Sequence, residues 1–134
     1  MIYKEFQDLK LSALGFGTMR LPVVDGNDGR IDEAKAAELF DYAIRHGVNY
    51  FDMASGDAAP FAPYGRAVAA AGMRDKVYFQ IHFGAEYTTG KYGWTLDLDA
   101  IKRSVDWQLT QLKTDYIDFG FIHCIDEESD YAKA

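Results

Sequence analysis

The sequence predicts an α/β fold with a parallel β-sheet, because short apolar segments alternate along the chain with segments of helical periodicity. The spacing of these segments suits βαβ crossovers. Three of the apolar segments end on ionisable residues, Asp52, His82 and His123. Since parallel α/β folds bind ligands at the carboxyl ends of their strands, these three residues mark a candidate site.

The first elements follow from local sequence patterns. Residues 1–21 predict a short β-hairpin that runs into an apolar strand ending near "GFGTM". Residues 26–29 predict a loop. Residues 32–47 predict the clearest helix, because apolar side chains recur there at helical spacing, Asp32 can cap its start and a glycine closes it.

The middle of the chain predicts two further strands. Residues 48–51 form one, and the loop expected after it, residues 53–65, contains two prolines. A short helix over residues 66–73 should lead into the strand of residues 76–82. A second long loop is expected over residues 84–94.

The last part repeats the strand and helix order. Residues 98–113 predict a helix with one apolar face, capped by either Asp97 or Asp99. A strand is expected over residues 115–123. The whole chain, residues 1–134, is thus expected to form one domain.

Composition limits the classes of partner. The chain of 134 residues is 49% hydrophobic and carries a net charge of −7, which disfavours nucleic acid and anionic membranes as partners. No apolar run approaches the length of a membrane helix. The single cysteine, Cys124, excludes an internal disulfide and favours a reducing, cytoplasmic setting.

Four segments together resemble the aldo-keto reductase family: "LGFGTMRLP", "AIRHGVNYFDMA", "MRDKVYFQ" and "SVDWQLTQLKTDYIDFGFIH". The resemblance implies a (β/α)8 TIM-type barrel, of which this chain supplies about the first four βα units after an N-terminal β-hairpin. It also implies an oxidoreductase that reduces a small-molecule carbonyl with NADP(H) or NAD(H). A full barrel takes roughly 250 residues, so the chain is expected to be a truncated, half-barrel form that binds the cofactor weakly.

The resemblance also assigns candidate catalytic positions. The family set is an aspartate, a tyrosine, a lysine and a histidine, and Asp52 and His123 match its first and last members. Asp57 stands where the family has the tyrosine, and His82 stands where it has the lysine. An alternative alignment would place the tyrosine at Tyr64, but it breaks the ungapped match of the following helix.

These departures leave several interpretations open. An imidazole titrates near neutral pH, so His82 could take the role of proton donor, or it could be a structural partner of Asp52. Gly17 and Thr18, with Asp52, are expected at the nicotinamide side of the cofactor. The aromatic residues of the 84–94 loop are expected either to wall a substrate site or to cover an open barrel edge; they are Tyr87, Tyr92 and Trp94.

Two other functions compete with carbonyl reduction. The chain could be a non-catalytic half-barrel that forms a homodimer or joins a complementary half. Alternatively, two histidines and a carboxylate could bind a metal ion; the candidates are Asp52, Asp57, His82 and His123. Their spacing does not support the metal site, because they come from separate strands.

Overall fold

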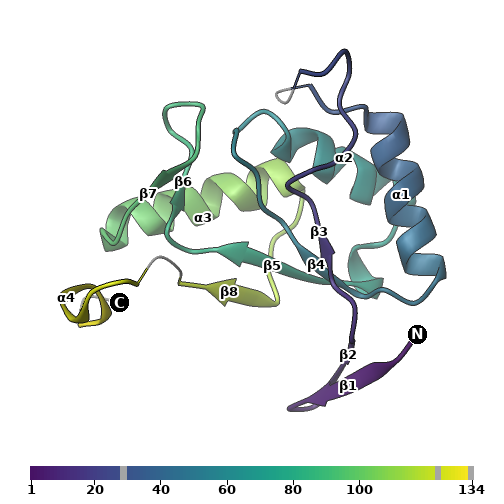
Figure 1. Ribbon diagram of the computed structural model, residues 1–134, viewed down its shortest axis with the longest axis horizontal. Helices are drawn as coiled ribbons and strands as arrows, with labels where there is room; N and C mark the ends of the chain where they lie inside the picture. The colour runs from purple at the N-terminus through teal and green to yellow at the C-terminus, as the bar shows by residue number, and fades with distance from the viewer. Residues whose placement is uncertain (28–29, 123–124, 133–134) are drawn as a thin grey trace.

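The computed structural model describes residues 1–27, 30–122 and 125–132. It contains a parallel sheet covered on one side by helices, with a separate hairpin at the N-terminus (Figure 1). Its strands are β1 (Tyr3–Phe6), β2 (Leu9–Ser12), β3 (Phe16–Gly17), β4 (Tyr50–Asp52), β5 (Tyr78–His82), β6 (Ala85–Glu86), β7 (Gly93–Trp94) and β8 (Phe119–Phe121). Its helices are α1 (Glu33–Arg45), α2 (Phe61–Ala71), the 3-10 turn η1 (Arg74–Lys76), α3 (Leu98–Leu112) and α4 (Glu128–Tyr131).

Four strands form the parallel sheet in the order β3–β4–β5–β8. Each pair of neighbours is joined by a helical crossover, so the strand order follows the chain order, as in the wall of a (β/α)8 barrel. The β1–β2 hairpin is antiparallel and lies at the amino-terminal end of the sheet (Figure 1). The predicted α/β fold, with a hairpin followed by about four βα units of a barrel, is therefore confirmed.

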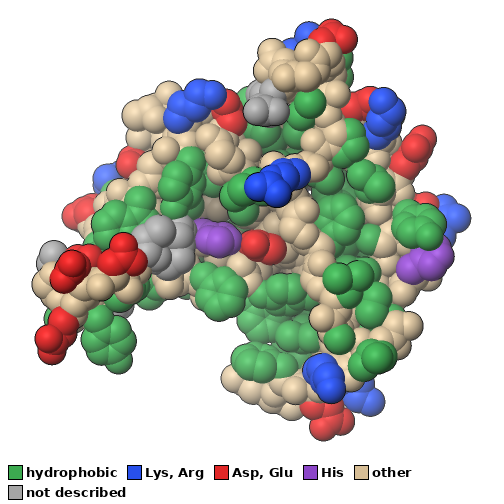
Figure 2. All heavy atoms as spheres, viewed as in Figure 1, with side chains coloured by type: hydrophobic (Ala, Val, Ile, Leu, Met, Phe, Trp, Pro, Cys, Tyr) green, Lys and Arg blue, Asp and Glu red, His purple; other side chains and the backbone are tan. Residues whose placement is uncertain are grey.

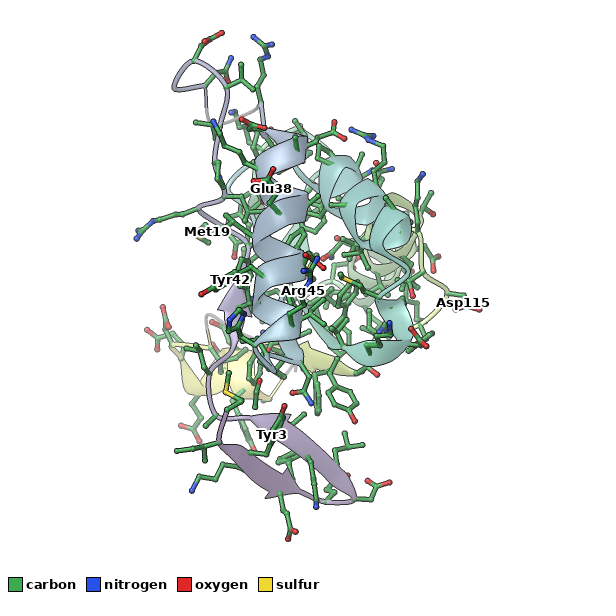
Figure 3. All side chains as sticks on the ribbon, turned by 90° about the vertical axis from the view of Figure 1, so that its right-hand side faces the viewer. Tyr3, Met19, Glu38, Tyr42, Arg45 and Asp115 are labelled. Atoms are coloured by element: carbon green, nitrogen blue, oxygen red, sulfur yellow. The ribbon has the colours of Figure 1, made fainter. Side chains whose placement is uncertain are left out.

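Helix α1 forms as the sequence predicts. The Asp32 side chain accepts a hydrogen bond from the Lys35 backbone nitrogen at 3.1 Å and so caps the first turn. Gly47, just past the last turn, has a φ of +88°, a conformation that glycine adopts without strain. The helix presents Ala36, Phe40 and Ala43 to the core, while Glu38, Tyr42 and Arg45 project from its outer side (Figure 3).

Helix α2 begins five residues earlier than the sequence prediction of 66–73. Residues 61–65 are helical although this stretch was predicted to be loop because of its prolines. Proline is compatible with the first turn of a helix, where its missing N–H has no acceptor to bond, and Pro60 and Pro63 both occupy this region. Gly65 then lies so close to α3 that a Cβ atom would collide with the Gln111 backbone oxygen.

Helix α3 resolves the choice between two caps. The Asp97 side chain accepts from the Ala100 backbone nitrogen at 2.8 Å, so Asp97 rather than Asp99 is the N-cap. None of the helices built from the described residues is both long and apolar enough to cross a membrane.

The segment predicted as a loop at 84–94 contains the short antiparallel hairpin β6–β7. Its tip docks on the loop that follows β4, through hydrogen bonds from Ala58 N to Gly90 O (3.0 Å) and from Tyr92 N to Gly56 O (3.2 Å). These main-chain bonds connect the β4 and β5 units above the carboxyl ends of the strands.

The two faces of the sheet differ. On the helix side, Phe51, Phe79 and Ile81 are buried. On the opposite side, Tyr50 and Phe119 are only partly covered and line an open groove of about 640 Å³ that reaches the β1–β2 hairpin. Figure 2 shows hydrophobic side chains spread over this part of the molecular surface.

Candidate active site

The strand order brings the predicted site residues to one edge of the sheet. Gly17 pairs with Asp52, and Asp52 pairs with Gln80. His82 ends β5 and pairs with Phe121 of β8. The carboxyl ends of four strands therefore meet where the sequence places its ionisable residues.

Asp52 and His82 are in direct contact. The His82 Nε2 atom lies 2.8 Å from Asp52 Oδ1. The Asp52 side chain is 39% exposed and that of His82 is 23% exposed, so the pair is accessible to a ligand without being free in solvent. At this distance the carboxylate can fix the orientation of the imidazole, and its negative charge can stabilise a positive charge that develops on the ring.

Two residues that the sequence analysis did not single out extend this contact. Gln80 is buried, and its Nε2 donates to Asp52 Oδ1 at 2.9 Å. The Tyr50 hydroxyl donates to Gln80 Oε1. Burial, and secondarily the negative charge of Asp52, raises the pKa of the Tyr50 hydroxyl, so it remains a donor. The period of two along a strand could have found both residues, because each lies two positions before a predicted site residue.

Asp57 is engaged elsewhere. Its carboxylate forms an ion pair with Lys91 from the loop between β6 and β7. The hydrogen bond from Lys91 is the main cause that holds the pKa of Asp57 below its usual range. Asp57 is thus an ionised acceptor on the neighbouring loop, and its bonding partner is Lys91 rather than the Asp52–His82 pair.

Thr18 ties two strand ends together. It is fully buried, its Oγ1 lies 3.1 Å from Asp52 O and 3.0 Å from Ala54 O, and it accepts from Ala54 N at 2.9 Å. Because these main-chain groups occupy the hydroxyl, Thr18 shapes the turn. A Cβ at Gly17 would meet no atom within 4 Å, which leaves open space beside Asp52.

A cavity of about 330 Å³ opens next to His82. Its lining residues are Met19, Ala54, Ser55, Gly56, His82, Tyr87 and Tyr92. Two of the three predicted wall residues, Tyr87 and Tyr92, belong to it, and Trp94 does not. The Tyr87 hydroxyl donates to Ser55 O at 3.0 Å, and burial raises the pKa of Tyr87 to about 12.

A second cavity, of about 480 Å³, shares Met19, Ser55 and Gly56 with the first and is therefore its neighbour. It contains the Asp57–Lys91 pair and Arg20. Polar, charged walls thus adjoin the more apolar walls around His82.

Tyr64, the alternative position for the family tyrosine, lies in the core. Its side chain is fully buried and its hydroxyl donates to Thr18 O at 2.8 Å. Burial raises the pKa of this hydroxyl. Tyr64 therefore supports the turn from beneath, and it lines neither cavity.

Two residues of the sequence prediction, His123 and Cys124, lie outside the described residues. Within residues 1–27, 30–122 and 125–132, no group of three or more histidine, cysteine, aspartate or glutamate side chains could hold a metal ion. Asp52 and His82 contact each other, while Asp57 contacts Lys91.

The described residues fit the nicotinamide end of a dinucleotide. The space at Gly17 lies beside Asp52, and the cavity next to it is bounded by His82 and aromatic rings. The cations near this edge are Arg20, which is exposed, and Lys91, which is paired with Asp57. These two do not make a built site for the phosphates.

Comparison with known proteins gives a consistent result. The model of the Aldo/keto reductase family matches residues 13–134. The uncharacterized oxidoreductase YqkF of Bacillus subtilis (strain 168) is 32% identical over 123 residues, which cover 87% of this chain and 36% of YqkF.

Solved structures agree with this result. PA4992 of Pseudomonas aeruginosa, assigned to the aldo-keto reductases, superposes with a TM-score of 0.75 and 26% identity over 97% of this chain and 50% of that protein. The aldo-keto reductase AKR11C1 of Bacillus halodurans gives a TM-score of 0.70 and 30% identity over 92% of this chain and 40% of that protein. The chain spans about a third to a half of the length of these relatives.

Proposed function

Since the chain belongs to the aldo/keto reductase family, we propose that it supplies the proton-transfer side of an oxidoreductase that reduces a small-molecule carbonyl to an alcohol. The observation that carries the proposal is the Asp52–His82 contact of 2.8 Å at the wall of a cavity. The cofactor, NADPH or NADH, supplies a hydride when it is bound.

His82 is the proton donor in this proposal. Because its Nε2 faces Asp52, the proton exchanged with a substrate oxygen is carried on Nδ1. Asp52 holds the ring in place and stabilises its positive charge. His82 thus stands at the position of the family lysine and takes the role of the family tyrosine. Asp57 stands at the position of that tyrosine.

The other predicted site residues have supporting roles. Gly17 and Thr18 shape the turn that would hold the nicotinamide ring, and His123 would orient the substrate carbonyl. Asp57 holds Lys91 and, with it, the tip of the β6–β7 hairpin over the site. Tyr87 and Tyr92 form an aromatic wall for the substrate. The single cysteine favours a cytoplasmic protein.

Activity assays on matched histidine variants test this assignment. We expect NADPH-dependent reduction of an aldehyde panel by the full chain, measured as loss of absorbance at saturating NADPH. His82→Gln should lower kcat by about 100-fold or more, the usual contribution of a general acid. His46→Gln, on the exposed end of α1, is the control and should keep the parent rate. Parent-like turnover in His82→Gln would overturn the assignment.

Cofactor affinity gives an independent test. Because the described residues offer no built phosphate site, we expect the chain alone to bind NADPH weakly. Titration followed by NADPH fluorescence measures this directly. Saturation at low micromolar NADPH would show that the chain holds the phosphates by other means.

A second function is favoured by the open side of the sheet. Phe121 is 55% exposed and Phe6 is 48% exposed, and the groove between the hairpin and β8 is mostly apolar. We propose that a complementary half-barrel covers this side. Two copies related by a two-fold axis along the barrel axis would keep all eight strands parallel and pair β8 of each copy with β3 of the other.

Analytical ultracentrifugation tests assembly independently of activity. A dimer at micromolar concentration is the expected result. A monodisperse, cooperatively folded monomer would contradict it. A dimer without turnover would favour the non-catalytic half-barrel over the reductase.

A further inference from the structure

We propose that Gln80 is a positioning residue: its carboxamide, oriented by Tyr50, fixes the Asp52 carboxylate so that His82 is held as the Nε2–H tautomer, with Nδ1 on the side of the ring away from Asp52. The proposal rests on the proposed function for the use that is made of Nδ1. The orientation of the Asp52 carboxylate and the tautomer of His82 do not depend on the proposed function.

Gln80 is in an unusual place for an amide. It lies in the middle of β5, its side chain is on the partly open face of the sheet, and only 2% of the residue is exposed. A buried amide that lacks hydrogen-bond partners destabilises the fold, so its bonds must be accounted for. Its nitrogen bonds to Asp52 Oδ1 at 2.9 Å, and its oxygen accepts from the Tyr50 hydroxyl.

The chemistry of the groups allows only one direction for these bonds. An ionised carboxylate only accepts, so Gln80 must turn its NH2 group towards Asp52. The Gln80 oxygen then faces Tyr50, which must donate. The phenol can do so because burial and the charge of Asp52 keep it protonated.

The same argument fixes the histidine. Asp52 Oδ1 lies 2.8 Å from His82 Nε2 and is much nearer to it than the Gln80 amide nitrogen at 3.5 Å, so the short contact to the carboxylate decides the tautomer. A bare Nε2 would place two acceptors against each other, so Nε2 carries hydrogen. Among the described residues, the titratable groups near the ring include Asp52 on β4 and the phenols of Tyr87 and Tyr92, which share its cavity.

The alternative hypothesis, that the Gln80 side chain only fills space, predicts a different result. If the side chain only filled space, methionine would replace it with little effect, since the two side chains have similar volume. If Gln80 positions Asp52, removing the amide frees the carboxylate, and the neutral ring should populate the Nδ1–H tautomer as well.

Long-range 1H–15N correlation spectra of histidine-labelled protein, recorded with His82 neutral, distinguish these forecasts. The parent should show His82 as the Nε2–H tautomer alone. Gln80→Met should add a population of the Nδ1–H tautomer, and Tyr50→Phe should do so to a smaller extent. The control is Gln108→Met on α3, which removes another buried glutamine, one whose amide nitrogen donates to Ser104 Oγ, and should keep the parent pattern.

The outcomes separate this proposal from the proposed function. A parent-like tautomer in both Gln80→Met and Tyr50→Phe would overturn the positioning role, whatever the activity. If Gln80→Met does not fold, Tyr50→Phe alone decides. A shifted tautomer together with parent-like turnover in His82→Gln would keep the positioning role and reject the reductase assignment. Where turnover is present, Gln80→Met should lower kcat and leave KM unchanged.

Discussion

The two faces of the β3–β4–β5–β8 sheet are built from the same strands, yet one face is buried under helices and the other is partly exposed. On the helix face, Phe51, Phe79 and Ile81 are buried, and α1, α2 and α3 lie over this face (Figure 1). On the other face, Tyr50, Gln80 and Asp52 form a polar chain, and the aromatic residues next to it are partly exposed. The difference shows that this chain completes its own helix-side core and leaves the barrel-side face, where a short polar chain adjoins an apolar groove, open to a ligand or a partner.

The largest expected effect contrasts a buried phenylalanine with an exposed one. Phe79 is fully buried, so Phe79→Ala should lower the free energy of unfolding by about 3–5 kcal/mol. Phe121, on the neighbouring strand, is 55% exposed in the single chain, and Phe121→Ala should cost less than about 1 kcal/mol at protein concentrations low enough to keep the chain monomeric. Urea unfolding followed by circular dichroism measures both. Equal losses would mean that the barrel-side face is covered in solution.

Glycines give the next contrast. At Gly65 an added methyl group collides with the Gln111 carbonyl, so Gly65→Ala should destabilise the chain by about 1–3 kcal/mol as α2 and α3 move apart. At Gly17 the same methyl group meets nothing within 4 Å, and Gly17→Ala should leave the melting temperature nearly unchanged. A clear loss at Gly17 would indicate that a second chain fills the space beside Asp52.

Tyr87 provides a pH-dependent test at the boundary between the two faces. Its pKa rises from the model-compound value of 10.0 to about 12. A raised pKa in the folded state means that the phenol stabilises the fold below pH 10, and that this contribution is lost as pH rises through 12. The stability advantage of the parent over Tyr87→Phe should therefore shrink by roughly 2 kcal/mol across this window. Urea unfolding at pH 9 and at pH 12 tests this, and a constant difference would contradict it.

The smallest effect is expected at the Asp57–Lys91 pair. Lys91 is 74% exposed, so Lys91→Met should cost less than about 1 kcal/mol at pH 7. The pKa of Asp57 is lowered in the folded state, so the contribution is present above its ordinary value of 3.8 and is lost as pH falls through the folded value. Thermal melts of the parent and of Lys91→Met should show a smaller difference in stability between the two proteins at pH 3 than at pH 7. An equal difference in stability at pH 3 would mean that Lys91 contributes through packing and not through its charge.

Much of the helix face could be predicted from sequence, because periodicity and end caps are local signals. Asp32 begins its helix as expected, and Asp97 is one of the two caps that the sequence offered for the later helix. The start of α2 could not be predicted in this way, since prolines indicate a loop and a first turn equally well. The hairpin β6–β7 was missed because each of its strands has only two residues.

The site was predictable only in part. Strand ends placed Asp52 and His82 at one edge, and the structure brings them into contact. The bond from Gln80 to Asp52 needed the register between β4 and β5, and the Lys91 bond to Asp57 spans 34 residues. Neither follows from a local pattern. The alternation of side chains along a strand could have indicated Gln80, but it would not have identified its partner.

The way in which the β6–β7 hairpin is anchored has a consequence for protein engineering. Ala58 and Gly56 hold its tip through main-chain atoms, so part of the anchoring remains when the side chain at position 57, which pairs with Lys91, is exchanged. A loop fixed by its backbone tolerates exchange of the side chain that it carries. Position 57 is therefore a natural place to graft a tyrosine, together with a lysine at position 82, and to recreate the four-residue set of the wider family on this scaffold.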